Sequence, residues 1–243
     1  MTEPALAFNV RGRGRHYRHP VTGEEVPSVT NVIGVVDKPA LPRWAAKVVA
    51  EQAWLLRGTL DELGRDEAVD VLKGAPWRKS TRAADRGTTI HDYLHARALG
   101  HEPPDLDGEA AKYRKAADGF LDLMKPEFLM TETTVFGAGY AGTFDFIARF
   151  GDRVVLGDYK TSKDLYPEVA LQLAAIANAD EAVVDGEIVS LPVVDECWGV
   201  LLTPSRFVVK RVDVEGAFGA FLAALELWHW KHGGVEMVEV MSP

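Results

Sequence analysis

The stretch "GYAGTFDFIARFGDRVVLGDYKTS", residues 139–162, holds two strand-like runs joined by a short turn, and these runs predict the centre of a sheet. Both runs are rich in β-branched and aromatic residues, which favour strands. Gly151 and Asp152 between them are typical of a tight turn. The preceding run, "EFLMTETTVFG" at 127–137, has the same composition. Together the three runs predict a three-stranded meander.

Two carboxylates and a lysine stand out in these runs. Asp158 and Lys160 lie two residues apart, so in a strand they point from one face toward the same volume. Asp145 interrupts an apolar run between Phe144 and Phe146, and a buried carboxylate is costly unless it binds a cation or accepts hydrogen bonds. If the strands are neighbours, Asp145 and Asp158 approach each other closely. A shared divalent cation would remove their repulsion.

The spacing of the two carboxylates and the lysine indicates metal-assisted chemistry. Carboxylate oxygens suit Mg²⁺ or Mn²⁺, and both ions bind phosphate and lower the pKa of a coordinated water. Lys160 on the same face could orient or deprotonate that water and stabilise the developing negative charge. The combination predicts hydrolysis of a phosphodiester. The alternative is a structural ion-pair network in which Lys160 only neutralises a carboxylate.

The rest of the chain alternates helical and strand patterns. Helical periodicity covers four segments before the meander, at 41–58, 61–73, 78–98 and 108–124. After it come a helix, two strands and a last helix, at 165–183, 197–204, 206–214 and 216–232. This order predicts an α/β fold with a mixed sheet flanked by helices and an N-terminal helical elaboration. We expect one domain over 1–243, with a helical portion at 1–107 and a mixed-sheet core at 108–243.

Composition narrows the class of protein. The 243 residues are 47% hydrophobic and 26% charged, as in ordinary globular proteins, and no apolar run approaches the roughly 18 residues of a membrane span. The N-terminus lacks the order of a signal peptide, so we expect a cytoplasmic protein. The single cysteine, Cys197, excludes a cysteine-built zinc site or iron-sulfur cluster within the chain.

The net charge and the local basic residues bear on whether the chain binds nucleic acid. The formal net charge of −9 argues against indiscriminate coating of nucleic acid, but it permits a local basic groove. A basic stretch includes Arg82 and Arg86, and Lys163 follows the meander. These side chains either contact phosphates or form solvated faces.

Four short motifs follow one another along the chain. "GTTIH" ends at His91, "GTFD" ends at Asp145, "DYK" spans 158–160, and "QLAAI" begins at Gln172. In this order they resemble the PD-(D/E)XK nuclease superfamily, specifically its RecB-like exonuclease branch, whose motifs are G-T-x-x-H, G-x-x-D, D-x-K and Q-x-x-x-Y. The resemblance covers about residues 86 to 176.

The resemblance implies a restriction-endonuclease-like core and a role for each matched residue. His91, Asp145 and Asp158 would bind the metal, together with the backbone carbonyl of Tyr159. Lys160 would be the catalytic lysine, with Gln172 near the scissile phosphate. Glu132 in the first strand is either an additional acid or an exposed strand residue.

This chain departs from the pattern at two points. Ile176 stands where the branch has tyrosine, which puts a DNA contact from that position in doubt. The chain is also similar to the CRISPR-associated spacer-acquisition nucleases, but those use four cysteines to hold an iron-sulfur cluster.

The resemblance implies a metal-dependent DNA exonuclease acting in recombination, repair or replication and leaving 5′-phosphates. The alternatives are a structure-specific DNA endonuclease and a non-catalytic DNA-binding subunit on the same fold. DNA is the expected partner, and by analogy a recombination or strand-annealing protein is a second one.

Overall fold

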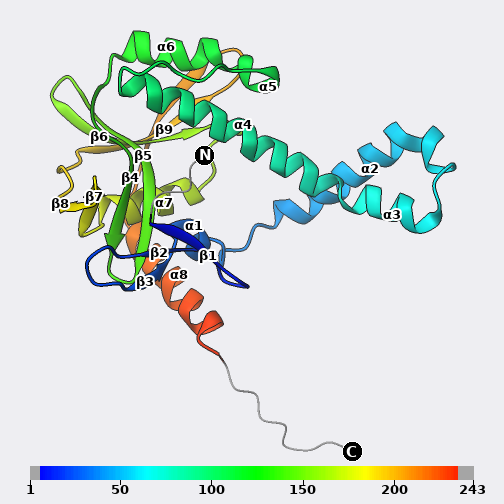
Figure 1. Cartoon of the computed structure of the whole chain (residues 1–243), viewed down its shortest axis with the longest axis horizontal. Helices are drawn as coiled ribbons and strands as arrows, with labels where there is room; N and C mark the ends of the chain where they lie inside the picture. Colours follow the sequence, from blue (N-terminus) through cyan, green and yellow to red (C-terminus); the bar gives the residue numbers. More distant parts are fainter. Residues whose placement is uncertain (1–5, 235–243) are drawn as a thin grey trace, which may run out of the picture.

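The computed structural model describes residues 6–234, and its centre is a seven-stranded sheet (Figure 1). The strands are ordered β10-β9-β6-β5-β4-β7-β8, with β6 and β9 parallel and every other neighbouring pair antiparallel. Their bounds are β4 Glu127–Gly137, β5 Tyr140–Phe150, β6 Arg153–Lys160, β7 Glu181–Val184, β8 Glu187–Val189, β9 Glu196–Leu202 and β10 Phe207–Val212. The predicted meander is confirmed as β4, β5 and β6.

Helices cover both faces of this sheet. Their bounds are α1 Val29–Ile33, α2 Ala40–Leu60, α3 Arg65–Lys73, α4 Ala75–Ala98, α5 Gly108–Ala111, α6 Arg114–Met124, α7 Glu168–Ala177 and α8 Ala217–His232. On one face, Ile90 of α4 and Phe120 of α6 pack with Tyr159. On the other, Leu173 of α7 packs with Leu156, and α1 and α8 lie beside α7. The predicted mixed sheet flanked by helices is confirmed.

Close packing at the centre of the sheet depends on a glycine. Gly157 of β6 pairs with Phe146 of β5, and the Phe146 ring lies over the position that a side chain at 157 would occupy. A Cβ at Gly157 would stand 1.8 Å from Phe146 Cζ. This close approach lets Phe146 pack into the core cluster beside Tyr159.

Gly157→Ala is expected to lower the free energy of unfolding by about 2–3 kcal/mol, because overpacking a closed core displaces its side chains. Urea unfolding measures the change. Gly219→Ala is the control, since no atom lies within 4 Å of a Cβ there and α8 should gain about 0.5–1 kcal/mol. Equal stability of Gly157→Ala and wild type would contradict this account of the core.

Two parts of the chain differ from the sequence-based expectation. Residues 7–27, which lie in the portion expected to be helical, form a small antiparallel sheet of β1 Ala7–Val10, β2 Gly14–Arg18 and β3 Glu25–Pro27. Tyr17 of this sheet packs on Phe136 of β4. The prediction that a helix reaches residue 183 is wrong, because α7 ends at Ala177 and β7 begins at Glu181.

An arm projects from the body of the molecule. Figure 1 shows α2, α3 and the N-terminal half of α4 extending away from the sheet, while the C-terminal half of α4 lies on it. Cys197 is buried in the core. Among residues 6–234, no helix has the length and apolar character needed to cross a membrane.

Candidate active site

Three side chains from different elements form a group that could hold a metal ion. His91 comes from α4, Glu132 from β4 and Asp145 from β5, and one ligand atom of each lies within 4.8 Å of the others. His91 Nδ1 stands 3.2 Å from Asp145 Oδ1. An imidazole nitrogen with two carboxylates is a donor set that divalent cations accept. The group therefore fits a metal, and it includes the acid that the sequence left undecided.

The two strands are irregular where they meet this group. The register pairs each neighbour of Glu132 with a neighbour of Asp145, and Glu132 itself has a φ of 45°, which is unusual for a residue other than glycine. Phe144 and Phe146 lie two residues apart, yet they pack into clusters on opposite faces of the sheet. The regular alternation of side chains between the two faces of the sheet is therefore interrupted at Asp145, and such irregularities are common beside functional sites.

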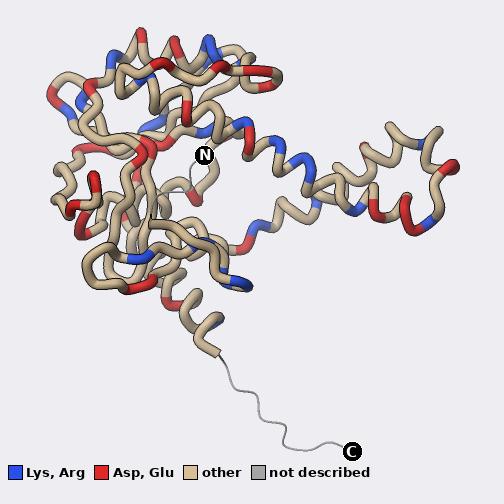
Figure 2. Tube along the Cα trace, viewed as in Figure 1, with Lys and Arg blue, Asp and Glu red and all other residues tan. Residues whose placement is uncertain are grey.

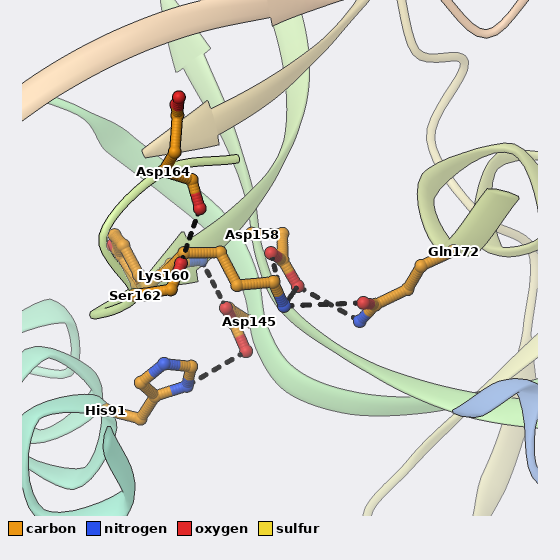
Figure 3. A network of polar contacts seen from close by, with 8 residues as sticks. His91, Asp145, Asp158, Lys160, Ser162, Asp164 and Gln172 are labelled. Carbon is orange, nitrogen blue, oxygen red and sulfur yellow. Dashed lines mark hydrogen bonds and ion pairs between the residues drawn. The ribbon is translucent and has the colours of Figure 1, made fainter. Parts of the chain in front are cut away.

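A second group of side chains lies next to the first (Figure 3). Asp158 Oδ1 accepts hydrogen bonds from Lys160 Nζ at 2.8 Å and Gln172 Nε2 at 3.0 Å. Lys160 Nζ also donates to Gln172 Oε1 at 3.3 Å. The backbone N–H of Tyr159 donates to Asp145 Oδ2, so Asp145 joins the two groups. Asp158 is held by Lys160 and Gln172 and does not belong to the three-residue metal group.

Electrostatics in the first group favour a charged pair. Although burial disfavours its cationic form, Asp145 raises the pKa of His91 to about 9. Burial also opposes ionisation of Asp145, but the nearby His91 holds the pKa of this carboxyl below its ordinary value. Desolvation and the Asp145 carboxylate raise the pKa of Glu132 to about 7. This concentration of negative charge is what a cation would neutralise.

The second group keeps its lysine charged. Burial favours the neutral amine, but Asp158 and Asp145 raise the pKa of Lys160 above its ordinary value. Burial raises the pKa of Asp158 despite the adjacent ammonium. Lys160 is therefore present as an ammonium that can donate hydrogen bonds and stabilise negative charge.

In metal-free buffer, the free energy of unfolding is expected to fall by on the order of 1–3 kcal/mol as pH rises from 6.5 to about 9. A raised pKa of His91 stabilises the fold fully below the unfolded value of 6.5, and this contribution is lost as the folded form deprotonates. Bound Mg²⁺ requires the neutral imidazole, so stabilisation by the ion should grow over the same range. Thermal unfolding with EDTA or with Mg²⁺ measures both effects. If the metal raises the unfolding temperature by the same amount at every pH from 6.5 to 9, this would argue against His91 as a ligand.

The structure also places the remaining residues singled out in the sequence. The Tyr159 side chain points into the core beside Phe120, as expected for its position in the strand. Ile176 is buried among core residues, so its side chain cannot contact a bound strand. Arg82, Arg86 and Lys163 all line one large groove.

Comparisons with known proteins found no matching sequence and only distant structural likenesses. No family model matches the sequence, and no curated protein matches it. Among solved structures, an alkaline exonuclease (LHK-Exo) from Laribacter hongkongensis is similar at 16% identity and a TM-score of 0.33, over 61% of this chain and 84% of that one. SSO0001 is similar at 13% identity and a TM-score of 0.27, over 58% and 85% of the two chains. These likenesses are distant, and the site geometry is what bears on function.

Proposed function

We propose that this chain is a metal-dependent DNA exonuclease of the PD-(D/E)XK superfamily, RecB-like branch. The observation that carries the proposal is the convergence of His91 from a distant helix on Asp145, directly beside the Asp158 and Lys160 pair. The four motifs quoted from the sequence thus contribute side chains to one contiguous network. The proposed domain spans 1–243, because the site needs a residue from 1–107 and others from 108–243.

The proposed metal ligands are His91, Glu132 and Asp145, whose ligand atoms lie close together, and Asp158 of the neighbouring group, which the family resemblance adds to them. A bound Mg²⁺ or Mn²⁺ would bind the substrate phosphate and supply an activated water. The imidazole nitrogen favours Mn²⁺, because Mg²⁺ prefers oxygen ligands. Ligation by the carbonyl of Tyr159 remains a part of this proposal.

The other polar groups have roles that do not depend on ligation. The Lys160 ammonium would donate to a phosphate oxygen and stabilise the negative charge that develops during hydrolysis. In this protonated form it orients the attacking water and does not deprotonate it. Gln172 holds both Asp158 and Lys160, so its amide fixes the position of the ammonium.

A structural ion-pair network explains this arrangement less well. Lys160 alone neutralises Asp158, and such a pair requires neither His91 nor Glu132 nearby. Burial and neighbouring carboxylates raise the pKa values of Glu132 and Asp158, so the ionised forms of these two side chains reduce the stability of the fold. Groups that reduce stability in this way are typical of functional sites.

The test is digestion of end-labelled linear DNA and of covalently closed circles with Mg²⁺ or Mn²⁺. The proposal predicts that linear DNA is shortened from its ends to products with 5′-phosphates, while closed circles survive. Linearised circles would indicate an endonuclease. Binding of DNA without cleavage of either substrate would indicate a non-catalytic subunit.

Asp158→Asn serves as the inactive variant in this assay. Asp152→Asn is the matched control, because Asp152 is an exposed residue of the β5–β6 turn outside the site. Equal digestion by Asp158→Asn and wild type would refute the assignment.

A further inference from the structure

A large groove borders the candidate site. It has a volume of about 1520 Å³ and lies between α4, the segment leading into α2, and residues 161–171. Pockets for small molecules occupy about 300–1,000 Å³. The size of this groove therefore suits a segment of an extended polymer.

Two walls of the groove belong to elements that carry the site. Arg86 lies on α4, five residues before His91, and Thr161 directly follows Lys160. The wall of residues 161–171 also includes Leu171 of α7, which precedes Gln172. Helix α4 also comes close to the end of β6, since a Cβ at position 87 would lie 3.4 Å from Thr161 Oγ1. A polymer in the groove would therefore lie beside the Asp158 and Lys160 group.

The groove carries positive charge on a chain whose net charge is −9. Its cationic residues are Lys38, Lys79, Arg82, Arg86 and Lys163, and its acidic residues are Asp37, Glu109 and Glu168. Figure 2 shows Lys and Arg along the stretch of α4 that forms one wall.

Several of these cations are available to a ligand. Within the described part of the chain, Arg82 and Lys163 form no salt bridge, whereas Lys38 is paired with Glu168 at 3.6 Å. Arg86 lies over the ring of Tyr113 and forms no salt bridge with any of residues 6–234. Free cations of this kind attract phosphates.

The groove also presents aromatic rings. Tyr166 is 57% exposed and Trp44 is 37% exposed, and both line the groove. Unpaired bases stack on such rings, whereas the bases of a duplex already stack on one another and keep their faces covered. Cations and accessible rings together are the features that bind single-stranded nucleic acid.

We propose that this groove holds a single-stranded end of the DNA and leads it to the hydrolytic site. The inference rests on the proposed function and adds the substrate class to it. Arg82, Arg86 and Lys163 contact phosphates, and Tyr166 and Trp44 stack on bases.

The test is fluorescence anisotropy in EDTA with a labelled DNA single strand and a blunt duplex, across a range of salt concentrations. The double variant Arg82→Gln, Lys163→Gln should bind the single strand at least tenfold more weakly at low salt, with a log-log salt slope reduced by about 1.4. Tyr166→Ala and Trp44→Ala should each weaken single-strand binding on the order of 5- to 100-fold. Wild type should prefer the single strand to the duplex.

Matched controls lie outside the groove. Arg149→Gln removes an exposed arginine of β5, and Trp230→Ala removes a tryptophan that is 66% exposed on α8. Both should bind as wild type does, and thermal unfolding should show that every variant is folded. Unchanged binding by the groove variants, or equal losses in the controls, would overturn the inference.

The two proposals fail in different ways. Single-strand binding that depends on the groove, in a protein without nuclease activity, would refute the proposed function and leave the groove assignment intact. Metal-dependent digestion with unimpaired binding by the groove variants would refute the groove and leave the nuclease.

Discussion

Replacing Lys160 by methionine is expected to lower the rate of DNA hydrolysis by roughly 10²–10⁴-fold, the range for a positioned group that acts on the transition state. The Nζ atom contacts Asp158 and Gln172 and is the only ammonium in the network of Figure 3. Methionine keeps most of the side-chain length but removes the charge and the donors. Single-turnover digestion of end-labelled DNA at saturating Mn²⁺ measures the effect on chemistry.

Two further measurements separate this role from a structural one. Lys115→Met, at an exposed position of α6, should digest DNA at the wild-type rate. Lys160→Met should keep the stabilisation by Mn²⁺, because Lys160 is not one of the three groups that surround the candidate metal position. Activity within a factor of about three of wild type would remove Lys160 from the mechanism.

Asp145→Asn is expected to abolish stabilisation by the metal and to lower hydrolysis by at least roughly 10³-fold, since a metal contributes several kcal/mol to the transition state. Asp145 lies in the metal group, pairs with His91 and accepts the backbone N–H of Tyr159. Its loss therefore removes a ligand and the contact between the two halves of the site. Calorimetric titration with Mn²⁺ and the digestion assay measure the two effects.

Asp152→Asn again serves as the control for Asp145→Asn. It should bind Mn²⁺ and digest DNA as wild type does, because the turn residue contacts none of the site groups in the described structure. Retained Mn²⁺ affinity in Asp145→Asn would show that the ion binds elsewhere.

The sheet and much of the site follow from local sequence rules. Strand composition and Gly151 predicted the β5–β6 hairpin, and a two-residue spacing placed Asp158 and Lys160 on one face. Both predictions need only the backbone period of a strand. The contact between His91 and Asp145, 54 positions apart, needed the order of motifs, because no local rule joins a helix to a distant strand.

Glu132 shows where strand periodicity stops being informative. Alternation assigns each residue to a face, but the backbone at Glu132 has a positive φ and the facing changes at Asp145 opposite it. Neither residue then follows the regular period. The sequence could name the acid but not place it in the metal group.

The error in α7 had a signal that was overlooked. Asp185 and Gly186 separate two short apolar runs, and Asp-Gly is a strong indication of a two-residue hairpin. In the structure both residues have positive φ, 51° and 83°, and they join β7 to β8. Alanine-rich helical periodicity before them had extended the predicted helix through Val183.

Metal-dependent hydrolysis at this site is tested by the rate of DNA hydrolysis measured against the concentration of added Mn²⁺, for wild type and Asp158→Asn side by side. We expect no hydrolysis by wild type in EDTA, a rise to saturation with Mn²⁺, and at most a trace of activity in the variant. Hydrolysis that persists in EDTA, or that proceeds equally in Asp158→Asn, would contradict this expectation.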